Sequence, residues 1–175
     1  MKKLLKRPTF IILAMLIILT VGSIFIHSMM TPAASSAESE TVGGIVEDVV
    51  DTVAPDNVTL KEYLKQNIRK IAHFIEFGAL GAEAILLSYL CLTHFSKGKE
   101  RIKAALYIKA SAYALAFGLL IAFFDESLQL ISKRGPLIED VWLDLGGFVS
   151  FSILTVGVIA LVKLIVYFAK KAKTP

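Results

Sequence analysis

The sequence predicts an all-α, polytopic membrane protein in which four transmembrane helices pack as one bundle. Hydrophobic residues make up 55% of the 175 residues and charged residues only 19%, and the mean hydropathy is +0.67. These values exclude an ordinary soluble domain. Four apolar stretches are long enough to cross a hydrocarbon core about 30 Å thick, which takes roughly 20 helical residues. They are Thr9 to Ile26, Ile71 to Leu92, Ala104 to Phe124 with an extension to Ile131, and Val141 to Phe168.

Basic clusters predict how these helices are oriented. Lysines and arginines precede the first span, separate the second from the third, and follow the fourth. By the positive-inside rule these regions are cytoplasmic, so we expect an N-in/C-in protein with segments 28–70 and 133–140 outside. The net charge of +4 is explained by these clusters, and we expect no nucleic acid partner. The clusters are Lys2, Lys3, Lys6 and Arg7; Lys97, Lys99, Arg101 and Lys103; and Lys163, Lys170, Lys171 and Lys173.

The first span, within residues 1–27, is expected to be an N-terminal transmembrane anchor. A cleaved signal peptide is the alternative, because a basic start, an apolar stretch and the triplet Ser35-Ser36-Ala37 are compatible with a cleavage site. We favour the anchor because the apolar stretch is longer than the roughly 7–15 residues of a signal core. The only cysteine, Cys91, excludes an intramolecular disulfide and a thiol pair for a metal or redox motif.

The segment 28–58 is expected to be a flexible, acidic, extracytoplasmic loop. It is rich in Ser, Ala, Thr and acids, and Pro32, Pro55 and a Gly-Gly pair at 43–44 interrupt it. A short amphipathic helix from Ile45 to Val53, lying on the membrane, is the alternative. We expect residues 59–169 to form a three-helix membrane core and residues 170–175 a basic cytoplasmic tail.

The second helix is expected to begin at Thr59 and to enter the bilayer without a break, because Thr59 to Glu62 match a capping box. Further along it, His73 and Glu76 are three residues apart and share a face. Glu83 lies roughly 15 Å deeper than His73. A carboxylate there must be neutral or find a donor, and we favour an interhelical hydrogen bond over a proton relay.

The third helix ends in a polar group formed by Asp125, Glu126 and Gln129. Gln129 follows the two acids by four and three residues, so at least one carboxylate faces inward with the amide. Adjacent acids cannot share one face of a helix. We expect one to lie inside the bundle, while the other meets the headgroups or caps a neighbouring element.

The fourth helix begins after a tight turn and carries Asp140 and Asp144, which are one turn apart near its positively polarised start. Arg134 in the turn can pair bidentately with a carboxylate or with a phosphate. The sequence leaves open whether Arg134 pairs with an aspartate of the bundle or binds a substrate. Ionisable groups gathered at one end of membrane helices indicate a functional site.

Three motifs in this order carry a family resemblance. They are Lys70-Ile-Ala-His73-Phe74-Ile-Glu76-Phe77 with Gly81; Asp125-Glu126-x-x-Gln129; and Arg134-Gly135-Pro136 with Asp140, Asp144 and Gly147. Together they closely resemble the VanZ-like family of bacterial membrane proteins, named for a teicoplanin-resistance protein. The resemblance covers about Arg69 to Leu161 and leaves out the first span, the acidic loop and Glu83. The family usually has Pro-Gly directly before the Arg, whereas this chain has Ser132-Lys133.

The resemblance implies a multi-pass protein of the bacterial cell membrane, with relatives linked to low-level resistance to lipid-bearing glycopeptides. Our first hypothesis is a non-enzymatic protein that binds a lipid headgroup, a lipid-linked envelope precursor or a lipoglycopeptide at the outer face. The ligand-binding candidates are Lys70, His73, Glu76, Asp125, Glu126, Gln129, Arg134, Asp140 and Asp144.

Two further hypotheses assign the same residues to chemistry. In a membrane-embedded hydrolase or transferase, Glu76 or Asp125 acts as general base, His73 carries the proton and Arg134 holds a phosphate, with Glu126 as a further catalytic candidate. We expect no cofactor; a divalent metal on His73, Glu76 and Asp125 or Asp140 is a variant that no ligand spacing in the sequence supports. A proton-coupled carrier using Glu83 and Asp125 requires a homo-oligomer.

Overall fold

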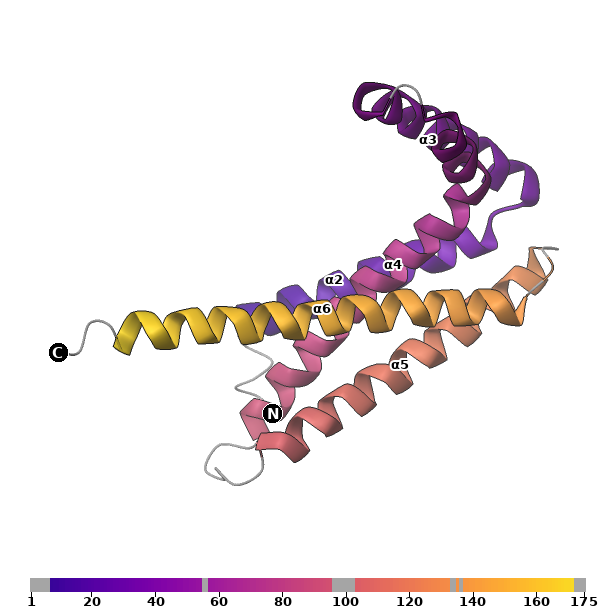
Figure 1. The fold of residues 1–175 in the computed structure, drawn as a ribbon. Coiled ribbons are helices and arrows are strands. Elements are labelled where there is room, and N and C mark those ends of the chain that lie inside the picture. Colours follow the sequence, from indigo (N-terminus) through magenta and orange to yellow (C-terminus); the bar gives the residue numbers. More distant parts are fainter. Residues whose placement is uncertain (1–6, 55–56, 96–102, 133–134, 136, 172–175) are drawn as a thin grey trace.

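The computed structural model describes residues 7–54, 57–95, 103–132, 135 and 137–171. In these ranges the chain forms five α-helices and no strand, and four of the helices are long and apolar enough to cross a membrane (Figure 1). The all-helical prediction is therefore confirmed. The helices are α2 (Pro8–Met29), α3 (Pro32–Val53), α4 (Val58–Phe95), α5 (Lys103–Ile131) and α6 (Ile138–Lys171). The four that can span a membrane are α2, α4, α5 and α6.

Helix α3 occupies the segment expected to be a flexible loop, so the structure differs from the sequence expectation there. Thr31 caps its start by accepting a hydrogen bond from a first-turn amide. Tertiary contacts then hold the helix, because Lys61 of α4 forms an ion pair with Asp51 and α3 packs along α4.

Helix α4 runs without interruption for 38 residues, roughly 57 Å, as expected of a helix that begins outside the bilayer. Its cap differs from the prediction. The side chain of Asn57, and not that of Thr59, accepts a hydrogen bond from the Leu60 amide at 3.0 Å. Asn is as good a cap as Thr, and the helix therefore starts one residue earlier, at Val58.

Glycines bring α4 and α6 into direct backbone contact. A Cβ on Gly81 would overlap the Phe148 carbonyl, and a Cβ on Gly147 would overlap the Phe74 carbonyl. The two helices therefore touch reciprocally at two levels. Ser152 adds a hydrogen bond to the Gly81 carbonyl at 3.0 Å. Such close approach is typical of helix pairs in membranes.

Helix α5 packs less closely on α6. The two meet near the C-terminus of α5 and splay apart toward its N-terminus (Figure 1). Phe148 of α6, only 1% exposed, fills the space between them against Gly118. The buried core is correspondingly small, and large apolar side chains such as Ile153 and Leu161 of α6 are more than half exposed. An apolar outer surface of this kind suits a helix bundle in lipid.

Candidate functional site

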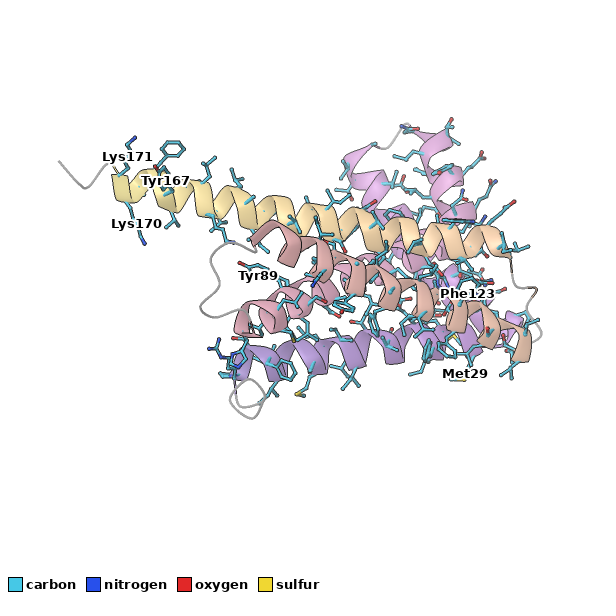
Figure 2. The ribbon with its side chains drawn as sticks, turned by 90° about the horizontal axis from the view of Figure 1, so that it is seen from below. Met29, Tyr89, Phe123, Tyr167, Lys170 and Lys171 are labelled. Carbon is cyan, nitrogen blue, oxygen red and sulfur yellow. The ribbon has the colours of Figure 1, made fainter. Side chains whose placement is uncertain are left out.

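The predicted polar cluster lies at one end of the bundle. Figure 2 shows Met29 and Phe123 at that end and Lys170 and Lys171 at the opposite end. The last turns of α2 and α5 and the first turns of α6 therefore meet here, beside the middle of α4.

Asp125, Glu126 and Gln129 of α5 are all buried, with exposed fractions of 0%, 6% and 2%. The Gln129 amide nitrogen donates to Asp125 Oδ2 at 3.2 Å and to Glu126 Oε1 at 2.6 Å. Its oxygen accepts from the Arg69 guanidinium of α4 at 3.4 Å. Gln129 therefore links both acids to a cation on the neighbouring helix.

Asp125 and Glu126 divide their roles as the sequence suggested for adjacent acids. Asp125 lies inside the bundle, where Ser28 of α2 donates to its Oδ1. Glu126 Oε2 accepts from the Leu137 amide at 2.9 Å, directly before α6. Of the two alternatives for the second acid, the structure shows the cap on a neighbouring element.

His73 and Asp144 complete the inner part of the cluster. His73 Nδ1 of α4 lies 3.9 Å from Asp125 Oδ2. Asp144 of α6 is 2% exposed, and its Oδ2 atom accepts no hydrogen bond from any residue in the described part of the chain. The structure thus brings together one predicted residue from each of α4, α5 and α6.

A cavity of about 460 Å³ opens onto this cluster. Its cationic side chains, Arg69 and Lys70, come from α4, and its carboxylates come from α5 and α6. Asp140 lines it beside Asp144, as expected for acids one turn apart. The lining also includes His73, Glu126, Gln129, Gln66, Leu143, Leu137, Gly135 and Pro32. Arg134, the predicted counter-ion, lies outside the described residues.

Glu76 belongs to a second group of side chains, in which its partners come from α2. His27 Nδ1 lies 2.8 Å from Glu76 Oε1, and Ser23 donates to the same oxygen at 2.9 Å. The other ring nitrogen of His27 is 3.4 Å from Glu38 of α3. His27, Glu38 and Glu76 line a smaller cavity of about 190 Å³, and His73 lines both cavities.

Helix α2 supplies four polar contacts to acids on other helices that the sequence reasoning missed. Thr20, Ser23 and Ser28 donate to acids on α4 and α5, and His27 contacts Glu76. A signal was present, since Thr20, Ser23 and His27 recur at helical spacing on one face of an otherwise apolar span. The first span therefore contributes to the site through Ser28.

Glu83 makes the interhelical hydrogen bond favoured from the sequence. Thr20 donates to its Oε1 at 3.1 Å, while its Oε2 is buried without a hydrogen-bond partner among the residues placed in the structure. Glu83 lies below the cluster and lines neither polar cavity.

Comparison with known proteins supports the resemblance seen in the motifs. The family model for VanZ/LLP1 matches residues 10–165 of the 175-residue chain. The match includes the first helix, α3 and Glu83, which the motif comparison had left outside the resemblance. Searches among curated proteins and among solved structures gave no match. Because the family model spans most of the sequence, the chain belongs to the VanZ/LLP1 family.

Proposed function

We propose that this chain is a multi-pass protein of the bacterial cell membrane that binds a lipid headgroup or a lipid-bearing glycopeptide and contributes to glycopeptide resistance, as in tolerance of teicoplanin. The observation that carries the proposal is the 460 Å³ cavity at one end of a bundle that can span a membrane. Open polar cavities with a few convergent charged groups are typical of ligand sites.

The charges in the cavity support an amphiphile whose headgroup carries both signs. Arg69 and Lys70 present donors for a phosphate or carboxylate. Across the cavity, Asp140 and Asp144 present acceptors for an amine or a cation. A ligand with only one sign of charge would leave one wall of the cavity without a partner.

Apolar grooves deeper in the bundle support a lipid-bearing ligand. Where α5 and α6 splay apart beyond Phe148, two apolar grooves of about 300 and 310 Å³ follow one another. Both are lined by Ile85, Ser111 and Val156. In this proposal the grooves hold hydrocarbon chains, while the headgroup occupies the polar cavity.

The orientation proposed from the basic clusters places the cavity in the outer leaflet. The cavity is at the end opposite Lys170 and Lys171, which the positive-inside rule assigns to the cytoplasm (Figure 2). A lipid-bearing glycopeptide reaches the membrane from outside, so the proposed site faces the correct side.

Charge-neutralising variants with neighbouring controls test the proposal. Lys70→Gln and Asp140→Asn remove charges that line the cavity, whereas Lys65→Gln and Glu139→Gln remove exposed charges that do not. We expect the first pair to lose copurified lipid, measured by native mass spectrometry, and to lower teicoplanin tolerance in cells with matched protein levels. Equal loss, or no loss, in both pairs would refute the binding site.

Asp125→Asn separates binding from catalysis, because the amide keeps the shape of the side chain but cannot act as a base. A binding protein should lose function in a graded way together with its lipid. If a hydrolase or transferase is correct, turnover should fall by about 10²–10⁴-fold while binding persists. Abolished tolerance with undiminished lipid would therefore favour the enzyme over the binding protein.

A further inference from the structure

Three potential metal ligands converge beside the cavity, one from each of three helices. His73 of α4, Asp125 of α5 and Asp144 of α6 each offer a ligand atom, and these atoms all lie within 4.8 Å of one another. The two carboxylates are 0% and 2% exposed, so water screens them little. The ligand set considered from the sequence contained Glu76, with Asp125 or Asp140, and it differs from the three residues that the structure brings together.

Asp144 supplies an independent indication that a ligand is missing from this cluster. Its Oδ2 atom is fully buried and has no hydrogen-bond partner in the described part of the chain. Two carboxylates this close repel each other when both are ionised. Arg69 and Lys70 line the same cavity, yet among the described residues neither forms an ion pair with Asp144.

Neighbouring donors hold Asp125 in a fixed orientation. Ser28 donates to one of its oxygens and Gln129 donates to the other at 3.2 Å. Outer hydrogen bonds of this kind orient carboxylates and imidazoles that bind metals. Neither donor satisfies Asp144, whose unpartnered oxygen belongs to the same group of three side chains.

We propose that His73, Asp125 and Asp144 bind one divalent cation of the zinc or manganese type. Imidazole nitrogen is a common ligand of Zn²⁺, carboxylates suit both Zn²⁺ and Mn²⁺, and two carboxylates neutralise a charge of +2. Ligand atoms around a tetrahedral Zn²⁺ lie roughly 3.4 Å apart. The three atoms therefore need to approach by at most about 1.4 Å from their 4.8 Å limit.

The three protein ligands leave coordination positions free on the side of the cavity, because His73 and Asp144 both line it. A phosphate or carboxylate in the cavity can occupy such a position. The metal proposal goes beyond the proposed function and does not depend on it, since the bare cation can be measured without any lipid or glycopeptide.

Metal titration of the purified full chain tests the proposal. The protein, carrying no histidine tag, is stripped with EDTA, reconstituted in nanodiscs and titrated calorimetrically with ZnCl₂ and with MnCl₂. We expect about one equivalent to bind the wild type. Asp144→Asn and Asp125→Asn should each weaken binding at least 100-fold, and Gln129→Leu should weaken it about 10–100-fold as an outer partner.

Glu83→Gln is the matched control, because Glu83 also has a buried oxygen without a partner in the described chain but lies outside the group of three. It should bind the metal like the wild type. His27→Gln should also leave the stoichiometry unchanged, which excludes binding at the group of His27, Glu38 and Glu76. Thermal unfolding of each stripped variant verifies that it is folded.

Two results would overturn the proposal. One is a wild-type protein that binds neither cation below about 100 μM, and the other is an Asp144→Asn variant that is folded and binds as tightly as the wild type. A wild-type protein that binds the metal but carries no lipid would instead count against the proposed function alone, so the two failures are distinguishable.

Discussion

The reciprocal contact between α4 and α6 predicts opposite outcomes for two adjacent substitutions. Gly146→Ala places a methyl group 3.7 Å from a ring atom of Phe74, which is an ordinary van der Waals contact. Gly147→Ala places the same group against the Phe74 backbone, within 3.1 Å of its Cα and overlapping its carbonyl oxygen. A side chain could rotate away, but a helix backbone cannot, so α4 and α6 must separate.

The magnitude follows from comparing the two variants. Both gain the same helix propensity, about 1 kcal/mol for Gly→Ala, and this contribution cancels in the comparison. Overpacking costs about 1–3 kcal/mol, and we expect the upper end because the obstacle is backbone. At roughly 2–4 °C per kcal/mol for a chain of this size, Gly147→Ala should unfold about 6–12 °C below Gly146→Ala.

Cys91 provides the assay. It is the only cysteine, it is half-buried in α4, and a maleimide dye that fluoresces on reaction reports its exposure during heating. Equal unfolding temperatures for the two variants would refute the close contact between α4 and α6. A second measurement follows from position, since Gly147 lies one turn after Asp144. Separation of the helices should therefore weaken metal binding in Gly147→Ala and leave it unchanged in Gly146→Ala.

Three other predictions concern topology and hydrogen bonding. In a cysteine-free background, a cysteine at Glu40 should react with an impermeant reagent in intact cells and one at Lys99 should not; labelling at Lys99 would contradict the N-in/C-in orientation. Ser28→Ala removes a donor to the buried Asp125 and should lower the free energy of unfolding by about 0.6–1.7 kcal/mol in denaturant titrations; no loss would exclude that bond as stabilising. Glu126→Ala leaves the amide before α6 without its acceptor and should cost about 0.5–2 kcal/mol, whereas Glu126→Gln should recover most of it; equal losses would exclude the capping role.

The sequence predicted the spanning helices well because hydrocarbon imposes a length and an apolar composition that are visible without tertiary information. For α3 it favoured a flexible loop, and its helical alternative covered only Ile45 to Val53. Its acids and its Gly-Gly pair are typical of a flexible segment, and the contacts that stabilise the helix, such as the ion pair of Asp51 with Lys61, join residues from different helices. The cap at Asn57 was missed for a local reason, since Thr59 and Glu62 match a stronger pattern nearby.

Spacing along single helices predicted the cluster on α5, and an acid of this cluster was expected near His73 or Glu76, but the spacing left open which residues would meet. Gln129 was expected to meet the adjacent acids because three- and four-residue spacings bring side chains together. Which acid meets His73 depends on how the helices are rotated, and this placed Glu76 beside His27 and Asp125 beside His73. The spacing of residues within one helix does not determine how that helix is rotated against its neighbours.

The hydroxyl groups of α2 have a consequence for how the protein is assembled in the membrane. Three acids on α4 and α5 receive hydrogen bonds from Thr20, Ser23 and Ser28, which emerge first from the ribosome. The donors are thus already in place when each acid-bearing helix enters the bilayer. Because α2 precedes α4 and α5 in the chain, each of these carboxyl groups enters the membrane after its hydrogen-bond donor. A permuted chain with α2 last would insert the acids before their donors had been synthesised.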